Sequence, residues 1–203
     1  MKKLFLTASF SQVSKYLPEF ANEPLAGKRI TFIPTANVPQ SNHSYVEAAK
    51  ADLTELGLIV DVLDLSSASA FDIQRKLSDN DYIYVSGGNT FFLLQELRLS
   101  GADIRIIEQV NKGKLYIGES AGSVITSPDI AYLSAMDSMK KAPLLVDTQG
   151  LNLVDFYTLP HYTNVPFEAE AQQIIDNYAD KINLQPISNT QYITVLDGVI
   201  TRS

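Results

Sequence analysis

Short apolar runs alternate with amphipathic helical patterns along most of the chain, and this alternation constrains the fold more than any other feature. The apolar runs are rich in Ile, Val, Leu and Tyr and end in turn-forming residues, which is typical of strands. Several are apolar at successive positions, as expected of strands that are covered on both faces. Six strands are predicted in this way: Leu4–Leu6, Ile30–Ile33, Leu58–Leu63, Ile83–Val85, Leu115–Ile117 and Tyr157–Leu159.

The predicted helices lie between these runs and carry apolar stripes at three- and four-residue spacing. Ser44-Tyr45-Val46-Glu47 has the spacing of a capping box, and Gly57 and Gly113 follow two of the stripes as stop signals. The stripes are Val46, Ala49, Leu53 and Leu56 in one helix, Ile104, Ile107 and Val110 in another, and Phe167, Ala171, Ile174, Ile175 and Tyr178 in a third.

This strand–helix order predicts an α/β fold, a three-layer sandwich with a mainly parallel central sheet and helices on both faces. Tyr192–Val195 and Gly198–Thr201 flank Leu196-Asp197 and are expected to form a C-terminal antiparallel hairpin. A length of 203 residues, 45% of them hydrophobic, suffices for one core, so a single domain over residues 1–203 is expected. Ligands of such sheets bind at the carboxyl ends of the strands.

The strongest chemical signal is Gly118-Glu119-Ser120-Ala121-Gly122, which follows the predicted strand Leu115–Ile117. This is the G-x-S-x-G pattern of a nucleophile elbow in its strand–turn–helix setting. Glycines on both sides allow strand and helix to pack closely around a strained serine. Ser120 is therefore the candidate nucleophile, and the following helix start offers N–H groups to an oxyanion. Glu119 is expected to face away from substrate as a polar turn residue, with a substrate contact as the alternative.

A second loop, Ser86-Gly87-Gly88-Asn89-Thr90, follows the strand Ile83–Val85 and opens the next predicted helix. Its position brings free N–H groups to the same sheet edge, where one could be the second oxyanion donor. The alternative is a flexible connection with Thr90 as the helix N-cap. No Gly-Lys-Ser/Thr follows, so a phosphate-binding loop is not expected.

A serine nucleophile needs a base, and histidine is the usual one. The chain has two histidines. His161 follows the strand Tyr157–Leu159 and is expected at the sheet edge that holds the serine. His43 lies in a polar stretch before a helix and is expected to be an ordinary surface residue.

Composition excludes several other classes of protein. The chain has no cysteine, so a disulfide, a thiolate metal site and a cysteine nucleophile are all excluded. The net charge is −7 without a basic stripe, which argues against nucleic-acid binding. No apolar stretch approaches the ~18 residues of a membrane span, and the N-terminal apolar run is better explained as a buried strand than as a signal peptide. A cytoplasmic location agrees with these features.

Taken together, the motifs resemble the peptidase E family of serine peptidases, which is related to cyanophycinase and to class I glutamine amidotransferase-like folds. The pieces that carry the resemblance are Phe32–Ala36, Ser86–Phe91, Leu115–Gly122 and Pro160–Asn164. The resemblance implies that Ser120 is the nucleophile and His161 the base. It implies an oxyanion hole made of the backbone N–H groups of Gly88 and Ala121, and no metal or cofactor.

The chain departs from the family pattern in two places. The family's third catalytic residue is a Glu before the last hairpin. The corresponding position here is Asn189, whose amide could still orient the imidazole. Asp155, Asp137 and Glu168 remain open as alternative carboxylates. Family members that cleave after an N-terminal aspartate carry an Arg beyond the histidine, but here Arg202 is the only Arg in that region. Strict Asp-X specificity is therefore not expected.

The sequence thus predicts a serine peptidase that acts on small peptides. Two alternatives stay open: a small esterase, in which an Asp would complete a Ser–acid–His order, and a weak or inactive binding module of the same fold, which Asn189 motivates. The expected partner is a small peptide substrate, with neither nucleic acid nor membrane, and a homodimer stays open.

Overall fold

A seven-stranded sheet forms the centre of the computed structural model, which describes residues 2–203. Its order is β3-β2-β4-β5-β1-β8-β9; the first five are mutually parallel, and β8 and β9 are antiparallel to their neighbours. The predicted parallel sheet and C-terminal hairpin are confirmed. The strands are β1 (Lys3–Thr7), β2 (Arg29–Ile33), β3 (Ile59–Val62), β4 (Tyr82–Val85), β5 (Leu115–Glu119), β8 (Tyr192–Leu196) and β9 (Val199–Arg202).

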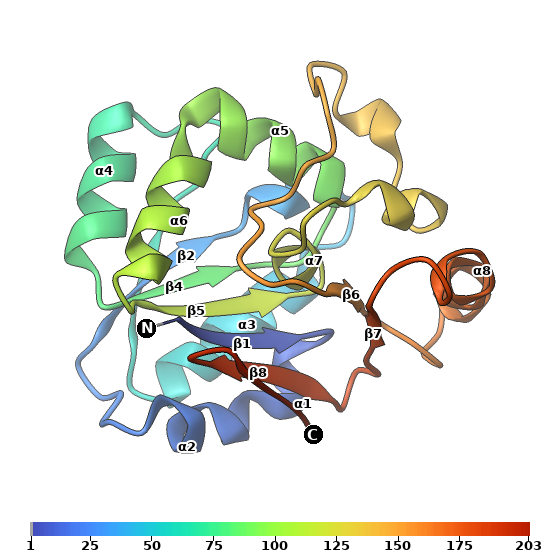
Figure 1. Cartoon of the computed structure of the whole chain (residues 1–203). Helices are drawn as coiled ribbons and strands as arrows, with labels where there is room; N and C mark the ends of the chain where they lie inside the picture. Colours follow the sequence, from blue (N-terminus) through green and yellow to red (C-terminus); the bar gives the residue numbers. More distant parts are fainter. Residues whose placement is uncertain (1) are drawn as a thin grey trace.

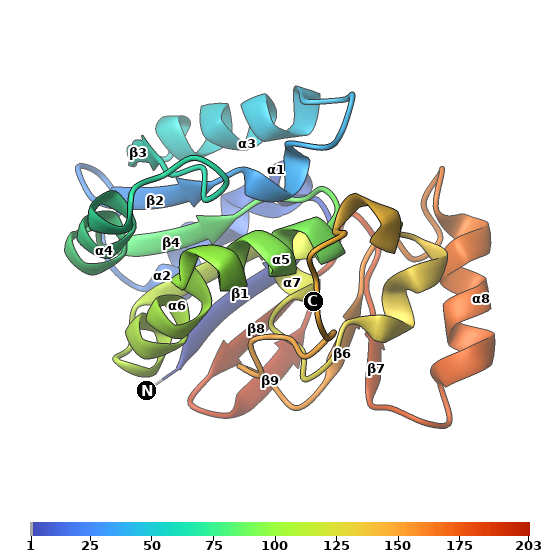
Figure 2. The same ribbon diagram turned by 90° about the horizontal axis from the view of Figure 1, so that it is seen from above.

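Helices cover both faces of this sheet, so the predicted three-layer arrangement is also confirmed (Figures 1 and 2). One face carries α1 (Phe10–Val13), α2 (Leu17–Ala21) and α3 (Ser44–Glu55). The other carries α4 (Ala70–Asp79), α5 (Thr90–Ser100), α6 (Ala102–Asn111) and the short α7 (Ala121–Val124). Short 3₁₀ turns lie in the connections: η1 (Ser14–Tyr16), η2 (Thr35–Asn37), η3 (Ala131–Ala135) and η4 (Met139–Lys141).

Each central strand contributes side chains to two separate cores because successive residues point to opposite faces. In β1, Leu4 and Leu6 pack into the core under α4–α7, whereas Phe5 packs into the core under α1–α3. All three are fully buried. This double burial is the physical reason why the strands are apolar without alternation.

The predicted strand Tyr157–Leu159 exists as β6. The expectation that it ends at the edge of the central sheet is wrong, because β6 does not join that sheet. It pairs in parallel with β7 (Leu184–Pro186) in a separate two-stranded sheet, next to α8 (Glu168–Tyr178). The central position beside β1 is taken by β8, which pairs with β1 over five residues. The small sheet and α8 lie at the end of the central sheet where the parallel strands stop (Figure 1).

Two local predictions about the helices are wrong, and so is the alternative that made Thr90 an N-cap. Ser44 is the first residue of α3 and bonds Asn42, so the capping box does not form and His43 holds the N-cap position. Asn89, not Thr90, caps α5 by accepting the N–H of Phe92 at 2.8 Å. In α6, Ile104 is 70% exposed, and the buried stripe instead uses Ile106, because the helix is rotated to place Ala102, Ile106 and Val110 on the sheet.

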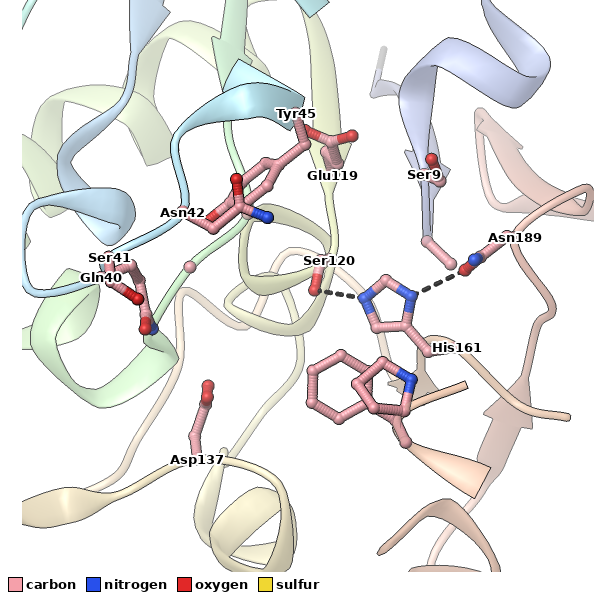
Figure 3. Close-up of a pocket in the computed structure, with 15 residues that line it drawn as sticks. Ser9, Gln40, Ser41, Asn42, Tyr45, Glu119, Ser120, Asp137, His161 and Asn189 are labelled. Carbon is pink, nitrogen blue, oxygen red and sulfur yellow. Dashed lines mark hydrogen bonds between the residues drawn. The ribbon is translucent and has the colours of Figure 1, made fainter. Parts of the chain in front are cut away.

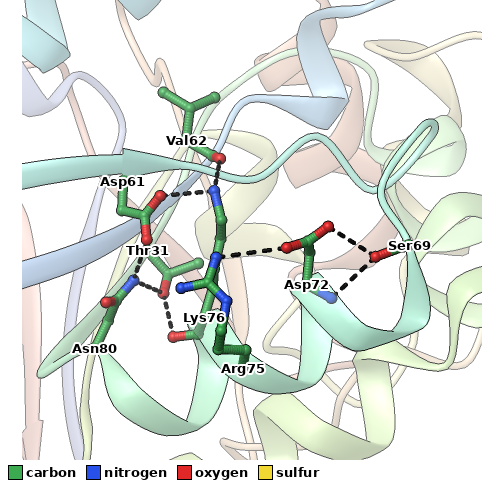
Figure 4. Close-up of polar contacts among 8 residues, drawn as sticks. All are labelled: Thr31, Asp61, Val62, Ser69, Asp72, Arg75, Lys76 and Asn80. Atoms are coloured by element: carbon green, nitrogen blue, oxygen red, sulfur yellow. Dashed lines mark hydrogen bonds and ion pairs between the residues drawn. The ribbon is translucent and has the colours of Figure 1, made fainter.

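A polar network ties the edge strand β3 to α4 and β2 (Figure 4). Lys76 of α4 contacts the Asp61 carboxylate at 2.6 Å and donates to the Val62 carbonyl at 2.6 Å. Asn80 donates to Asp61 and to the hydroxyl of Thr31, which in turn donates to the Lys76 carbonyl. These bonds satisfy polar groups at an edge that would otherwise be open. Every helix within residues 2–203 is too short or too polar to cross a lipid bilayer.

Candidate active site

A cavity of about 360 Å³ opens at the carboxyl ends of the parallel strands. Ser120, His161 and Asn189 lie along one side of it, and a wall of polar side chains lies opposite (Figure 3). That wall comes from the loop after β2 and the start of α3 and consists of Gln40, Ser41, Asn42 and Tyr45. The sequence interpretation missed this wall, although its polar composition directly after a buried strand was a usable signal.

Ser120 sits in a sharp turn between β5 and α7, as the elbow pattern predicts. Its backbone has φ 48° and ψ −108°, a conformation that side-chain-bearing residues rarely adopt. A Cβ on Gly122 would lie 2.0 Å from the Val85 carbonyl oxygen, and one on Gly118 would lie 2.6 Å from the Gly122 carbonyl oxygen. Both glycines are therefore required because strand and helix backbones touch at these points.

The hydroxyl of Ser120 meets the ring of His161, and the ring meets Asn189. His161 Nδ1 lies 2.7 Å from Asn189 Oδ1, and His161 Nε2 lies 3.0 Å from Ser120 Oγ. An amide oxygen can only accept, so Nδ1 carries the ring proton and Nε2 is left to accept the serine proton. Asn189 is held in turn, since its N–H donates to Asn164 Oδ1 at 2.8 Å.

The surroundings of His161 favour its neutral form. Its ring stacks on Phe167, the residue before α8, with centroids 5.0 Å apart and planes at 27°. Burial lowers the pKa of His161 from its ordinary 6.5, and this outweighs the opposite effect of the hydrogen bond to Asn189. The imidazole is therefore unprotonated at neutral pH and able to accept a proton.

Gly88 lies in a backbone conformation that glycine alone adopts readily, with φ 141°. A Cβ there would lie 2.1 Å from the Ala36 carbonyl oxygen, so the loop is pressed against η2. A Cβ on Gly87 would lie 3.2 Å from the Cβ of Ser120, which puts the loop directly beside the elbow. Within residues 2–203, the N–H groups of Gly88 and Ala121 have no acceptor in the protein.

The structure does not bring the alternative carboxylates to His161. Asp137 lines the cavity, but its Oδ2 accepts the N–H of Thr90 at the start of α5 (2.7 Å). Burial raises the pKa of Asp137. Asp155 lines a different hollow beside Lys2, and Glu168 begins α8. The group that meets Nδ1 is the Asn189 amide.

Glu119 is placed differently from the expectation that it faces away as a polar turn residue. Its side chain is turned into the protein and only 3% exposed, where it accepts the N–H of Phe10 and the hydroxyl of Tyr84. The reason is that the residue before the elbow is the last of β5, and its side chain faces the core under α1–α3. His43 bonds Asn37 at the entry to α3 and does not line the cavity.

No lysine or arginine lines this cavity among the residues that the structure describes. Arg202 donates to the Pro186 carbonyl at 3.3 Å, and Lys181 lies over the ring of Tyr178. No group of three or more metal-binding side chains occurs within residues 2–203.

Comparison with known proteins identifies relatives over nearly the whole chain. Residues 4–202 match the family described as Peptidase family S51. The uncharacterized peptidase Lmo0363 of Listeria monocytogenes is 54% identical over 195 residues, which are 96% of this chain and 95% of that protein. Peptidase E of Salmonella arizonae is 34% identical over 151 residues, which are 73% of this chain and 61% of that protein.

Solved structures give the same relationship. A crystal structure of a Listeria monocytogenes EGD-e protein assigned to peptidase E has a TM-score of 0.96 at 51% identity and covers 100% of this chain and 98% of that chain. A peptidase from an acI-B1 actinobacterium has a TM-score of 0.73 at 20% identity, covering 100% of this chain and 87% of that chain, which shows a shared fold.

Proposed function

Because the chain belongs to peptidase family S51, and is thus a peptidase, we propose that it hydrolyses small peptides by a serine mechanism. Ser120 is the nucleophile, His161 is the general base, and Asn189 orients the imidazole. The observation that supports this most strongly is the continuous contact from Ser120 Oγ to His161 Nε2 (3.0 Å) and from His161 Nδ1 to Asn189 Oδ1 (2.7 Å).

In the first half-reaction, Ser120 Oγ attacks the peptide carbonyl carbon while His161 Nε2 takes the hydroxyl proton. The carbonyl oxygen becomes an oxyanion, for which the N–H groups of Gly88 and Ala121 are the proposed donors. The C–N bond then breaks as the imidazolium gives its proton to the leaving amine. An acyl-enzyme on Ser120 and a free amine result.

In the second half-reaction, His161 takes a proton from water, whose oxygen attacks the acyl carbon. The ester bond to Ser120 breaks, the serine regains its proton from the imidazolium, and the acid product leaves. Asn189 holds the imidazole in the required tautomer in both halves. It stabilises the imidazolium less than a carboxylate would, so we expect slower turnover than with an acid at this position.

The cavity supports small substrates without an acidic side chain before the scissile bond. Its volume of about 360 Å³ suits a dipeptide or a short peptide end. A substrate carboxylate would find no arginine or lysine partner in the lining and would meet the carboxyl group of Asp137. We therefore propose a peptidase without strict Asp-X specificity.

The reducing cytoplasm remains the proposed location, on the ground that the chain has no cysteine. A small peptide remains the proposed partner.

The decisive experiment is a competitive screen of dipeptides and aminoacyl amides, with Asp-X peptides included. Ser120→Ala is expected to lower kcat/KM by more than about 10³-fold, because the nucleophile is lost while the cavity is kept. Labelling by a fluorophosphonate should disappear in the same variant.

Two results would overturn the proposal. Hydrolysis of short p-nitrophenyl esters without any peptide cleavage would favour an esterase. A folded wild-type protein that resists labelling and cleaves neither class would favour a binding module.

A further inference from the structure

His161 and Asn189, unlike Ser120, are not carried by the central sheet. His161 follows β6 and Asn189 follows β7, and these two strands form a sheet of their own. Among the described residues, the last backbone hydrogen bond between the two segments runs from the Tyr162 N–H to the Ile187 carbonyl (3.0 Å). The contact between the imidazole and the Asn189 amide lies beyond that bond, so it needs a further support.

The loop that carries the imidazole has an unfavourable backbone conformation. His161 has φ 61° and Thr163 has φ 63°, in the left-handed region that residues with a Cβ rarely adopt, and β-branched residues least of all. Such a conformation persists only where the surrounding structure fixes it. Here the Asn164 N–H donates to the His161 carbonyl (3.0 Å), and the Phe167 N–H donates to the Asn164 carbonyl (2.9 Å).

The side chain of Asn164 adds a third bond, since its Oδ1 accepts the N–H of Asn189 at 2.8 Å. Asn164 thus binds the residue that carries the ring, the residue that stacks on it and the residue that meets Nδ1, which are His161, Phe167 and Asn189. The two main-chain bonds do not depend on the side chain at position 164, whereas the third requires a short side chain with an acceptor. Within residues 2–203, the ring of His161 makes the one other side-chain hydrogen bond between these two loops.

We propose that Asn164 is a positioning residue of the catalytic base, whose side chain holds the Asn189 turn against the His161 loop. This inference rests on the proposed serine mechanism. The Asn164 side chain does not line the cavity and acts through Asn189. Without this bond the amide oxygen can move away from Nδ1, and the ring can then carry its proton on Nε2, which leaves no acceptor for the Ser120 proton.

The test compares wild-type protein with Asn164→Ala, Asn164→Asp and Ser69→Ala. Asn164→Ala removes the acceptor, whereas Asn164→Asp keeps an acceptor oxygen at the same place in the side chain. Ser69→Ala is the stability control, because its hydroxyl accepts the Asp72 N–H (3.1 Å) as the N-cap of α4, outside the cavity lining (Figure 4). Asn164 and Asn189 are only partly buried, so Asn164→Ala and Ser69→Ala should lower the unfolding temperature to a similar, small extent.

Only Asn164→Ala should slow the reaction. With the best peptide of the screen at about pH 8, where the imidazole is neutral, kcat should fall about tenfold while KM stays within about twofold. Asn164→Asp should keep kcat within about threefold of the wild type, since the acceptor is retained. Ser69→Ala should keep the wild-type kcat. An unchanged kcat in Asn164→Ala, or equal losses in Asn164→Ala and either of the other variants, would overturn the proposal.

A second measurement separates this inference from the serine mechanism itself. The Nδ1 proton of His161 should give a slowly exchanging NMR signal in wild-type protein, Asn164→Asp and Ser69→Ala, and a broadened or absent one in Asn164→Ala. His43, the other histidine of the chain, faces the Asn37 amide oxygen through Nδ1 and serves as the internal reference. If wild-type protein neither cleaves peptides nor reacts with a fluorophosphonate, the serine mechanism fails, but this signal still tests the support of Asn189. A His161 signal that is unchanged in Asn164→Ala would overturn it.

Discussion

The ring of His161 lies between Asn189 Oδ1 and Ser120 Oγ, so one ring nitrogen donates a hydrogen bond and the other accepts one. Asn189 fixes the proton on Nδ1, so Nε2 faces Ser120 as an acceptor. Burial lowers the pKa of this histidine below 6.5, so its imidazole is neutral at neutral pH. Among the described residues, no carboxylate contacts the ring to reverse that effect. Asn189 therefore sets the orientation of the imidazole, whereas burial is the main cause of its lowered pKa.

Replacing Asn189 by Asp tests this relationship. In the wild type, kcat/KM should fall as the pH drops through the lowered pKa of His161, giving an acid limb below pH 6.5. A carboxylate favours the imidazolium, so in Asn189→Asp the limb should move to higher pH by about one pH unit, with a plateau raised by about tenfold. Asn189→Ala is the control and should lose activity. A pH profile of kcat/KM that does not move in Asn189→Asp would contradict the assignment.

At the scale of elements, the site depends on how closely β5, α7 and β4 approach one another. The strand–turn–helix around Ser120 packs so tightly on β4 that Gly122 touches the Val85 carbonyl. The elbow follows β5, and the Gly87-Gly88 loop follows β4. The same contact therefore places the elbow beside that loop. Two loops that are separate in sequence thus become one site because their strands are paired in register, Val85 opposite Gly118.

Gly122→Ala should therefore destabilise the protein strongly. The added Cβ would lie 2.0 Å from the Val85 carbonyl oxygen, and the backbones would have to separate, which we expect to cost about 3 kcal/mol or more of unfolding free energy. Gly198→Ala is the matched control, since it has φ 83° and nothing within 4 Å, so that only backbone strain of about 1 kcal/mol is expected. Urea unfolding measures both. Equal losses in the two variants would refute the close approach.

At the scale of the whole molecule, the cavity is assembled from chain segments that are far apart in sequence. The loop after β2 forms one wall, and the segment before η4 contributes Asp137. Lys141 joins the two walls, because its ammonium donates to the Pro39 carbonyl at 2.8 Å and to Gln40 Oε1 at 3.1 Å. The shape of the cavity thus depends on a contact between residues about a hundred positions apart.

Lys141→Met should loosen this wall without touching the chemistry. We expect KM for the preferred peptide to rise about threefold, with kcat nearly constant, since exposed hydrogen bonds contribute about 1 kcal/mol or less. Lys140→Met removes the same charge at the neighbouring position and should leave KM unchanged. A KM that rises equally in both variants would point to net charge, not to the tether, as the cause.

The sequence by itself determined the sheet and helix pattern and the local chemistry of the elbow. Strands buried on both faces are apolar throughout, and a serine turn between touching backbones needs glycine on both sides. Both features can therefore be recognised from consecutive residues in the sequence. The pairing of Ser120 with His161 was predicted from the need for a base, from the place of His161 after a strand and from the family resemblance, although that strand, β6, lies outside the central sheet.

The tertiary structure decided the rest because it depends on contacts between distant segments. Only folding could show that β6 leaves the central sheet and that Asn189, not Asp137 or Asp155, reaches the imidazole. Only folding could turn Glu119 inward onto Tyr84 and Phe10. The direction of a side chain at the end of a strand depends on which core the sheet packs against. The spacing of residues along one chain segment does not show which segment forms that core.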